Sequence, residues 1–374
     1  MTGPTLFIRS VDEITRDWVS AVLATSGAAK AAKALSAVQL EPLNGMGPDG
    51  EEASRGYMST VIRVHIRYRG DTEGEIEPAT LVVKLPPQQD DRFAIGAALK
   101  LFAREMHFYR DIAPGLHIGI PKCYLALGDG ERGGAVCVLE DGGKWQPVEQ
   151  TEGMSVPHAT TAVDMIAKLH ARWWNRPELH KLDWLPDTLW GRDNAFEEAW
   201  PGFIESYASV LSPEEVLIGE QLAALQGALQ AALDQRPQTF IHGDFRAGNM
   251  FVDGPDPDRP ILIFDWQVVA RGMGATDPAR LICGSLPASV PPTIYREFAV
   301  RWHAALVEAG VAGYTQDEAW DDFRLGFLQA VYAPVCFHAN ADTKSRSGRA
   351  LFEALARRMF RTVRVTDALS LLKQ

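Results

Sequence analysis

The segment FIHGDFRAGNMFVD, residues 240–253, constrains the fold more than any other part of the sequence. An apolar pair precedes its polar residues and another apolar pair follows them, which predicts a short loop held between two short strands. The polar residues His242, Asp244 and Asn249 have the spacing H-x-D-x-x-x-x-N. Any fold of this chain must therefore hold a carboxylate and a carboxamide close together on one fixed loop.

This spacing matches the catalytic-loop pattern of kinases, in which the Asp receives the proton of an acceptor hydroxyl and the Asn binds a metal ion. Asp265 ends a second apolar run, ILIF, 16 residues beyond Asn249. Mg²⁺ prefers a few hard oxygen ligands together with water and nucleotide phosphates. Asp and Asn beside Gly are also ordinary turn residues. The combined pattern nevertheless favours Asp244 as a catalytic base and Asn249 and Asp265 as metal ligands.

Lys84 is a second candidate, because it lies in the apolar run ATLVVKL. A charged group is costly there unless it is paired or placed on a ligand. Glu105 follows on a helix predicted over 94–112. A strand Lys that contacts the nucleotide phosphates and is oriented by a helix Glu is the kinase arrangement. The alternative is that Glu105 makes a surface ion pair with Lys100 or Arg104 of its own helix.

A Gly-rich segment before the strand predicted at 60–68 is a weaker candidate for phosphate binding. Its backbone N–H groups and hydroxyls can cradle phosphate, and the alternative is an ordinary flexible loop. The candidates there are Ser54, Arg55, Gly56, Ser59 and Thr60. The chain has no GxxxxGK[ST] motif, which excludes a P-loop enzyme, and no GxSxG elbow, which argues against a hydrolase.

The pattern of apolar residues changes at the Gly/Pro break GGKWQP, residues 142–147. Strands are predicted before it at 60–68, 79–85 and 135–141, with helices at 11–35 and 94–112. Helical patterns dominate after it, at 157–174, 195–208, 213–234, 292–309, 316–338 and 347–372, with short strands at 238–244 and 261–266. We therefore predict an α+β, protein-kinase-like fold of two lobes. The N-lobe, 1–141, holds a small antiparallel sheet and binds nucleotide phosphates, and the mainly helical C-lobe, 142–374, carries the catalytic loop, the metal and the acceptor site.

Composition limits the other possibilities. The net charge of −11 and the pI of about 5.4 argue against general nucleic-acid binding. The four cysteines form no CxxC pair, and neither a signal peptide nor a membrane span is predicted, so we expect a cytoplasmic protein. The spacing of His158, His170 and His180 does not place them on one helix face, and His170 is expected to be packed. Several tryptophans could line an acceptor pocket, but core packing is the favoured interpretation for Trp173, Trp174, Trp184 and Trp190.

The segments IHGDFRAGNM, FDWQ and DPARLI resemble the aminoglycoside phosphotransferase and choline kinase-like superfamily. LFAREMHFYRDIAP, VLEDGG and IAKLHARWW are similar to its ecdysteroid-kinase-like (CHK kinase-like) branch, and the resemblance spans roughly residues 40–285. It implies that Asp244 is the base, that Asn249 and Asp265 hold metal, and that Lys84 contacts phosphates and is oriented by Glu105. It also implies a hinge at Leu139, Glu140 and Asp141 whose backbone faces adenine, and a catalytic loop supported by His242 and Asp277.

One residue departs from the pattern: Gln267 stands where choline kinase-like members often carry an acidic residue, which puts a second tightly held metal in doubt. The resemblance implies an enzyme that moves the γ-phosphate of Mg-ATP to a hydroxyl of a small molecule. The acceptor is expected to be a hydroxylated apolar or cationic compound. The alternative is a catalytically silent, nucleotide-binding or regulatory module. The interval between Asp265 and Asp277 is too short for a long activation segment, which favours a small-molecule acceptor over a protein kinase. Oligomeric state is left open.

Overall fold

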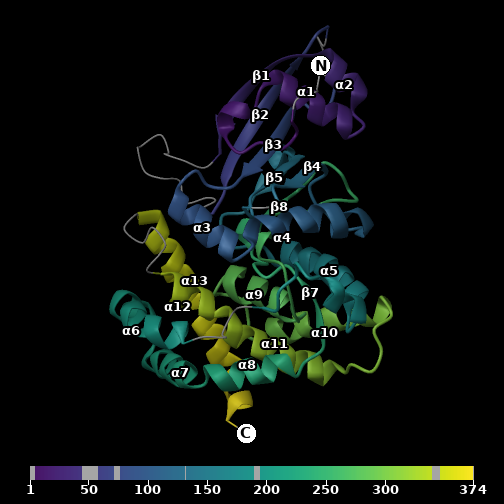
Figure 1. Ribbon diagram of the computed structural model, residues 1–374. Helices are drawn as coiled ribbons and strands as arrows, with labels where there is room; N and C mark the ends of the chain where they lie inside the picture. The colour runs from purple at the N-terminus through teal and green to yellow at the C-terminus, as the bar shows by residue number, and fades with distance from the viewer. Residues whose placement is uncertain are drawn as a thin grey trace. The chain divides into compact units, whose positions relative to one another are not determined.

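The computed structural model describes residues 5–43, 58–70, 76–130, 132–188, 194–338 and 346–373. The chain forms two compact units, whose elements are labelled in Figure 1. The first is Met1–Lys144 together with Phe264–Val268, and the second is Trp145–Ile263 together with Val269–Gln374. The assignment of nucleotide binding to 1–141 and of acceptor binding to 142–374 stays a prediction.

The first unit is built on a five-stranded antiparallel sheet with the order β1-β2-β3-β5-β4. Strand β2 has the bounds that the alternation of apolar residues predicts, and β3 and β5 match their predictions to within a residue. Strands β1 and β4 were not predicted, and β4 is adjacent to β5 at one edge. The strands are β1 (Leu35–Pro42), β2 (Thr60–Tyr68), β3 (Thr80–Leu85), β4 (Cys123–Gly128) and β5 (Ala135–Glu140).

Helices α1 (Arg16–Thr25) and α2 (Ala29–Ala34) replace the single helix predicted over 11–35. Thr15 caps α1 by accepting a hydrogen bond from Trp18 N through its hydroxyl oxygen (3.2 Å). The apolar side chains of α1 form one core cluster with β2 and β3, including Ile62, Val64, Leu81, Val83 and Leu85. Because successive strand residues point to opposite faces, Lys84 faces away from this cluster.

The helix predicted over 94–112 is interrupted. It consists of α3 (Asp90–Ala98), α4 (Leu101–His107) and a π-helical turn over Phe108–Ile112. Lys100 has a left-handed backbone (φ 55°) and separates α3 from α4, as a residue just beyond a helix end often does. Ile95 and Leu99 are 54% and 41% exposed, so the apolar period of this run does not mark one continuous buried face.

The second unit is mainly helical. The predicted helices 213–234 and 316–338 are each broken in two, and α9 was not predicted. The helices are α5 (Val156–Trp173), α6 (Ala195–Tyr207), α7 (Pro213–Ala224), α8 (Gln226–Asp234), α9 (Thr276–Ser285), α10 (Thr293–Glu308), α11 (Gln316–Ala330), α12 (Tyr332–Phe337) and α13 (Arg346–Val365). Two small antiparallel sheets accompany them: β7 (Gln238–Ile241) pairs with β10 (Ala270–Met273), and β8 (Met250–Val252) lies between β6 (Gln146–Pro147) and β9 (Leu262–Ile263).

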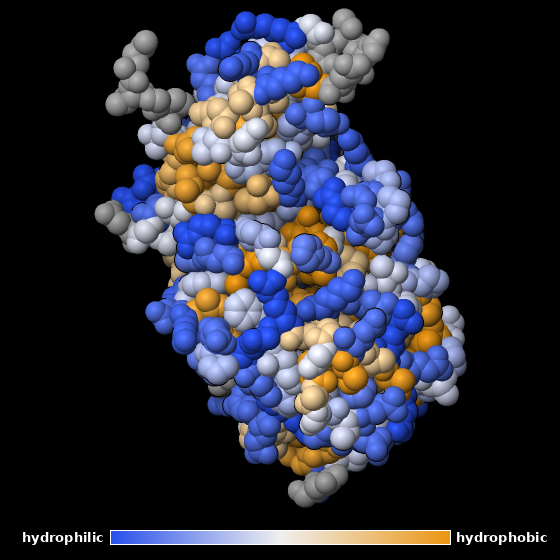
Figure 2. Space-filling view, turned by 90° about the vertical axis from the view of Figure 1, so that its right-hand side faces the viewer, coloured by the Kyte–Doolittle hydropathy of each residue, from blue (hydrophilic) through white to orange (hydrophobic). Residues whose placement is uncertain are grey.

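Tryptophans of the second unit lie in its aromatic core. Trp174 packs on Trp302 and Tyr314, and Trp173 packs on Phe240, as the core interpretation predicted. Trp190 lies outside the described residues. On the face seen in Figure 2, hydrophilic residues predominate and hydrophobic residues form separate groups. Among the described helices, none alone is long and apolar enough to span a bilayer; only α7 and α8 taken together reach that length, across a bend of 70°.

Candidate active site

The first unit brings together Lys84, Glu105 and Asp265, which come from three distant parts of the chain. Lys84 Nζ donates to Glu105 Oε1 at 2.7 Å and to Asp265 Oδ1 at 2.9 Å. Lys84 reaches Glu105 because α4 covers the sheet face opposite α1. Asp265 belongs to the group because Phe264–Val268 packs with the first unit. The Lys84–Glu105 pair expected from the sequence is therefore present.

The electrostatics of this group keep the lysine charged. The side chains of Lys84, Glu105 and Asp265 are only 13%, 6% and 24% exposed. Burial lowers the pKa of Lys84, but the attraction of Asp265 and Glu105 outweighs this and leaves it above its ordinary value. One ammonium lies between two carboxylates, so the ionised group carries an excess negative charge that favours a further cation.

Gln267 lies in the short 3₁₀ turn Trp266–Val268 beside this group. Its Nε2 is 3.5 Å from Asp265 Oδ2, and its Oε1 is buried with no hydrogen-bond partner among the described residues. An unpaired buried oxygen next to a carboxylate is a site that a cation satisfies. The neighbourhood of Asp265 therefore fits a magnesium ion, whose ligands are hard oxygens.

The catalytic loop of the second unit runs from β7 to β8. Gly243 turns the chain with φ +81°, a backbone that glycine adopts without strain. Asp277, in the first turn of α9, accepts hydrogen bonds from His242 N (2.7 Å) and Gly243 N (2.9 Å). His242 is fully buried, and its Nδ1 accepts from Asp244 N at 3.2 Å. Both residues thus support the loop, as the resemblance implied.

Asp277 is itself held by a buried chain of side chains. Trp302 Nε1 donates to His170 Nδ1 (3.1 Å), so His170 carries its proton on Nε2 and donates it to Asp277 Oδ2 at 3.2 Å. His170 is fully buried, as expected for a packed histidine. Each oxygen of Asp277 is engaged, and the carboxylate is fixed from two sides.

The far end of the loop is held by residues that the sequence did not single out for this role. Ser285, at the end of α9, accepts from Ala247 N through its Oγ (3.2 Å). Gln150 accepts from Gly248 N through Oε1 (2.8 Å) and donates to Ser285 Oγ through Nε2 (3.1 Å). Helix α9 therefore fixes both ends of the loop, with Asp277 at one end and Ser285 at the other.

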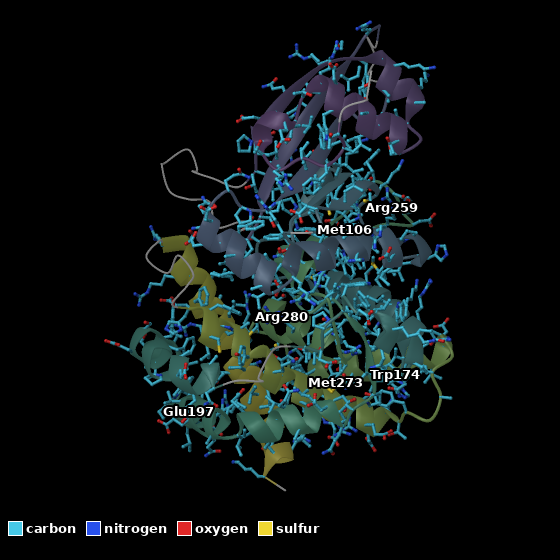
Figure 3. The ribbon with its side chains drawn as sticks, viewed as in Figure 1. Met106, Trp174, Glu197, Arg259, Met273 and Arg280 are labelled. Carbon is cyan, nitrogen blue, oxygen red and sulfur yellow. The ribbon has the colours of Figure 1, made fainter. Side chains whose placement is uncertain are left out.

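Asp244 lies in the middle of this loop between two arginines. Arg280 Nε donates to Asp244 Oδ1 at 2.9 Å, and Arg246 Nε donates to Oδ2 at 3.0 Å. Burial raises the pKa of Asp244, but the charges of Arg280 and Arg246 outweigh burial and hold it well below its ordinary value. Arg280, labelled in Figure 3, was not predicted. Its position one helical turn after Asp277 on α9 is the signal that places both residues on one face.

Asn249 completes the loop. Its Nδ2 donates to the carbonyl oxygen of Asp244 and to Asp244 Oδ2, both at 2.9 Å. These bonds orient the amide so that Oδ1 remains available as a hard oxygen ligand. Asn249 lies in the second unit and Asp265 in the first, and their shared role as metal ligands stays a prediction.

The predicted hinge residues use their carboxylates within the first unit. Asp141 Oδ2 pairs with Arg63 Nε (2.7 Å), and Glu140 Oε2 accepts from Lys122 N (3.0 Å). Their side chains are thus engaged, while the backbone contact to adenine stays a prediction. Ser59, just before β2, is 8% exposed. The phosphate-binding candidates Ser54, Arg55 and Gly56 lie outside the described residues.

Comparison with known proteins agrees with this architecture. The model of the ecdysteroid kinase-like family matches residues 53–310. A choline kinase from Cryptosporidium parvum Iowa II has the same fold, with a TM-score of 0.51, 11% identity, and coverage of 89% of this chain and 90% of that one. An ethanolamine kinase from Plasmodium vivax is also similar, with a TM-score of 0.48, 10% identity, and coverage of 96% of this chain and 92% of that one. A GDP complex of an aminoglycoside 2'-phosphotransferase is similar with a TM-score of 0.48, 15% identity, and coverage of 90% of each chain. No curated protein matches the sequence.

Proposed function

This chain belongs to the ecdysteroid kinase-like family, and we propose that it is a small-molecule kinase that transfers the γ-phosphate of ATP to a hydroxyl group. The observation that carries the proposal is Lys84, held between Glu105 and Asp265. A charged, oriented lysine on a sheet is suited to gripping nucleotide phosphates, and the carboxylate on its other side is suited to holding the metal that accompanies them.

The proposed reaction needs little covalent chemistry from the protein. The oxygen of the acceptor hydroxyl forms a bond to the γ-phosphorus as the bond from that phosphorus to the β,γ-bridging oxygen breaks. ADP leaves with the electron pair of that bond, and the hydroxyl proton passes to Asp244. The protein's contribution is to position the two substrates and to neutralise charge.

Asp244 is a weak base, because its pKa lies well below the ordinary value. Its main role is therefore to accept a hydrogen bond from the acceptor hydroxyl and so orient it, with the proton moving late in the transfer. Asn249 Oδ1 and the Asp265 carboxylate would hold Mg²⁺, and that ion supplies neutralisation of phosphate charge. Gln267 Oε1 is a further oxygen available there.

A second candidate function, a catalytically silent nucleotide-binding module, is favoured by one observation. The two oxygens of Asp244 already accept hydrogen bonds from Arg280, Arg246 and Asn249. A carboxylate has about four acceptor positions, and the second guanidinium contact from Arg280 Nη2 occupies another. An acceptor hydroxyl must therefore displace one of these donors before it can bind Asp244. If none of the donors leaves Asp244, no acceptor is oriented and the module is catalytically silent.

The first test separates nucleotide binding from transfer. We expect ATP with Mg²⁺ to raise the melting temperature of the wild-type protein, since a ligand that binds only the native state stabilises it. Asp265→Ala should lose the magnesium-dependent part of this shift. Asp244→Asn should keep the shift and lose transfer of labelled γ-phosphate to a panel of alcohols.

Each outcome decides between the candidates. Transfer by the wild-type protein that Asp244→Asn abolishes supports the kinase. A Mg-ATP shift with no transfer to any alcohol supports the silent module. No shift with any nucleotide contradicts both. An unchanged Mg-ATP shift in Asp265→Ala would rule out its role as a metal ligand.

A further inference from the structure

Arg280 lies at the candidate active site, but the proposed reaction gives it no role. Its guanidinium group donates twice to one oxygen of Asp244, from Nε (2.9 Å) and from Nη2 to Oδ1. The other oxygen, Oδ2, accepts from Arg246 Nε (3.0 Å) and from Asn249 Nδ2 (2.9 Å). Among the described residues, Arg280 is thus the only donor to Oδ1, whereas Oδ2 has donors from two residues.

This difference decides which donor an acceptor hydroxyl can replace. If Arg246 leaves, Oδ2 still accepts from Asn249, whose Nδ2 is also tied to the carbonyl oxygen of Asp244 (2.9 Å). If Arg280 leaves, Oδ1 is cleared completely and has free lone pairs for a hydroxyl. Departure of Arg280 also keeps Asn249 in the orientation proposed for metal binding. Arg280 is therefore the donor whose movement opens Asp244.

The charges around Asp244 are not balanced. Arg246 and Arg280 share this one carboxylate, and no other carboxylate pairs with either among the described residues. Asp277, on the same helix as Arg280, is taken up by two backbone N–H groups of the loop and by His170. Two guanidinium groups against one carboxylate leave an excess positive charge, which attracts a further anion.

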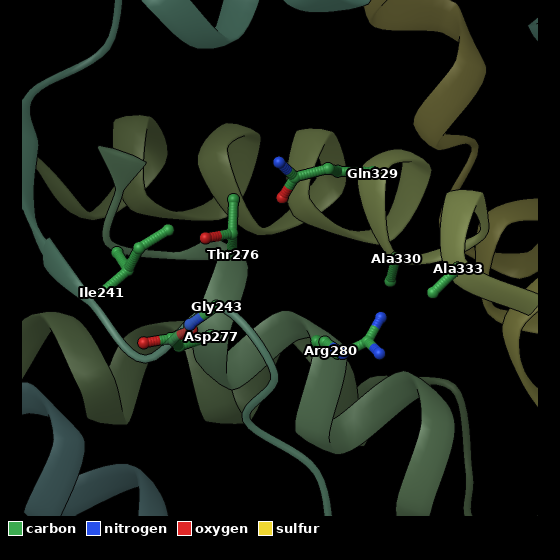
Figure 4. Close-up of a pocket in the computed structure, with 8 residues that line it drawn as sticks. All are labelled: Ile241, Gly243, Thr276, Asp277, Arg280, Gln329, Ala330 and Ala333. Carbon is green, nitrogen blue, oxygen red and sulfur yellow. The ribbon is translucent and has the colours of Figure 1, made fainter. Parts of the chain in front are cut away.

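The guanidinium group of Arg280 also has little water to turn to. The side chain is only 16% exposed. In Figure 4 it extends from α9 toward Ala330 and Ala333, at the junction of α11 with α12. The methyl groups of these alanines cannot accept a hydrogen bond. If Arg280 releases Asp244, it needs another anion in its place, because an unpaired buried charge is costly.

From these contacts we infer that Arg280 is a further catalytic residue, which moves from Asp244 to the γ-phosphoryl group of the nucleotide. The inference rests on the proposed kinase function, in which the acceptor oxygen at Asp244 attacks the γ-phosphorus from about 3 Å. The phosphoryl oxygens are then within reach of the side chain that holds Oδ1. A phosphoryl group carries more negative charge than a carboxylate and can bind a guanidinium group through two parallel hydrogen bonds.

This exchange gives Arg280 two effects on the reaction. It frees Oδ1 of Asp244, to which the acceptor hydroxyl then donates, and it places a positive charge on the group being transferred. Without a γ-phosphate, Arg280 stays on Asp244 and the acceptor hydroxyl is not oriented. The exchange is thus the movement that distinguishes an active kinase from a silent module.

Nucleotide affinity in the absence of any acceptor tests the inference without relying on activity. The probes are Mg-ADP and Mg-AMP-PNP, whose γ-phosphate is not transferred, and calorimetric titration gives their dissociation constants. Arg280→Ala should weaken AMP-PNP binding about tenfold, the effect of one hydrogen bond between charged groups, and leave ADP binding unchanged. Unchanged ADP binding also shows that the variant is folded. If Arg280→Ala does not fold, Arg280→Lys gives the same comparison, because lysine keeps the charge but loses the two parallel hydrogen bonds.

The matched control is Arg271→Ala. The side chain of Arg271 is 15% exposed, and it donates to Asp187 (2.8 Å) and to the carbonyl oxygen of Leu179 rather than to Asp244. This control removes a similar ion pair of the second unit, and it should change neither dissociation constant.

Phosphate transfer then separates a catalytic role of Arg280 from a structural one. Arg280→Ala should lower kcat for the best alcohol of the panel about a hundredfold, as the loss of one donor to transition-state charge does. Added guanidinium ions should restore part of this activity, because they can occupy the vacated position beside the phosphoryl group. Guanidinium should not raise kcat in Arg271→Ala.

The outcomes distinguish this inference from the proposed function. Equal weakening of ADP and AMP-PNP, or an unchanged AMP-PNP affinity, in Arg280→Ala would overturn the inference while the kinase function stands. A rise in transfer would also overturn it, since Arg280 would then only block Asp244. So would a loss confined to alcohols that carry a carboxylate, since Arg280 would then bind the acceptor. Absence of nucleotide binding or of transfer to every alcohol in the wild type would contradict the kinase function and this inference with it.

Discussion

At the scale of single residues, the site depends on charges removed from water and placed against each other. Lys84 is the clearest case, because its one ammonium group pairs with both Glu105 and Asp265. Removing one partner of a buried ionic group leaves an uncompensated charge, which costs much more than the same change at the surface. The residues proposed to grip the nucleotide are thus also residues on which the stability of the first unit depends.

We predict that Lys84→Met lowers the free energy of unfolding by roughly 3 kcal/mol and abolishes phosphate transfer. The loss of stability arises because Glu105 and Asp265 then repel each other in a buried place. Urea unfolding measures the first effect and labelled phosphate transfer the second.

The matched control for this variant is Lys144→Met, because Lys144 pairs with Glu77 at the surface and should contribute little. Adding Glu105→Gln to Lys84→Met should restore part of the stability but none of the activity. Equal destabilisation by Lys84→Met and Lys144→Met would contradict the prediction.

Asp322 lies away from the catalytic loop and makes the stability of the second unit depend on pH. It is fully buried, accepts from Tyr314 Oη (2.7 Å), and burial raises its pKa from 3.8 to about 6. Between pH 4 and 6 the folded protein therefore binds a proton that the unfolded chain has released. The contribution of Asp322 to stability therefore falls as the pH rises through this window and is constant above it.

We predict that the stability of Asp322→Asn relative to wild type rises by roughly 3 kcal/mol between pH 4 and pH 7. The measurement is the free energy of unfolding in urea at several pH values. Asp321→Asn, at a neighbouring, more exposed position, is the control and should show no such trend. Parallel pH profiles for wild type and Asp322→Asn would show that the pKa of Asp322 is not raised.

Some site residues could be predicted from the sequence and others could not, for a definite reason. Lys84 was predictable because a charge inside an apolar run requires a partner, and Glu105 because it lies on the following helix. Arg246 and Arg280 were not predicted. Their roles depend on what each side chain meets in three dimensions, and a polar residue in a helix carries no sign of its partner.

At the scale of elements, helix α9 organises the active loop. Asp277 in its first turn and Ser285 at its end each accept a hydrogen bond from the loop backbone, and Arg280 between them contacts Asp244. One helix thus sets the position of the carboxylate from three points. The helix was not predicted, because all of its residues except Arg280 are buried, and a short buried run does not distinguish a helix from a strand by periodicity alone.

We predict that Asp277→Asn lowers kcat about a hundredfold, as expected when a reacting group is displaced by about 1 Å, and leaves Mg-ATP affinity unchanged. The amide cannot accept from both loop N–H groups and His170 as the carboxylate does. Kinetics with the best alcohol, together with the Mg-ATP thermal shift, measure the two effects.

Ser285→Ala provides the comparison, because it removes one acceptor at the other end of the loop and should have a smaller effect on kcat. If Asp277→Asn lost Mg-ATP binding and transfer together, the aspartate would be needed for more than the position of Asp244.

Other elements show what periodicity can and cannot determine. Strand β2 was predicted with its bounds because its alternation reflects one buried face and one open face. The run 94–112 has an uninterrupted helical period, yet Lys100 adopts a left-handed backbone between α3 and α4. Nothing in the local sequence marks such a break, since lysine has no special tendency toward that conformation.

At the scale of the whole molecule, the predicted α+β fold with an antiparallel sheet and a helical part is confirmed. The division of the chain is less simple than a cut near residue 144, because Phe264–Val268 is part of the first unit. Trp266 from this segment is fully buried, and its ring stacks on Phe108 with centroids 3.9 Å apart. The first unit therefore takes part of its core from the middle of the second unit's sequence.

We predict that a fragment of residues 1–144 does not unfold cooperatively, because Phe108 loses Trp266 and Lys84 loses Asp265. Joining residues 261–270 to its end through a flexible linker should restore a cooperative urea transition. The same joined segment with Trp266→Ala is the control and should not. Equal midpoints for the fragment with and without the segment would show that the first unit is complete without it.

This borrowed segment also has a consequence for the timing of biosynthesis. The ribosome releases residues 1–144 first, but Trp266 emerges only about 120 residues later, which at ordinary elongation rates is roughly 6 to 25 s. During that interval the ring face of Phe108 and the side of Lys84 that meets Asp265 lack their permanent partners. The nascent N-terminal half must wait, or be shielded by a chaperone, until the second half has largely been made.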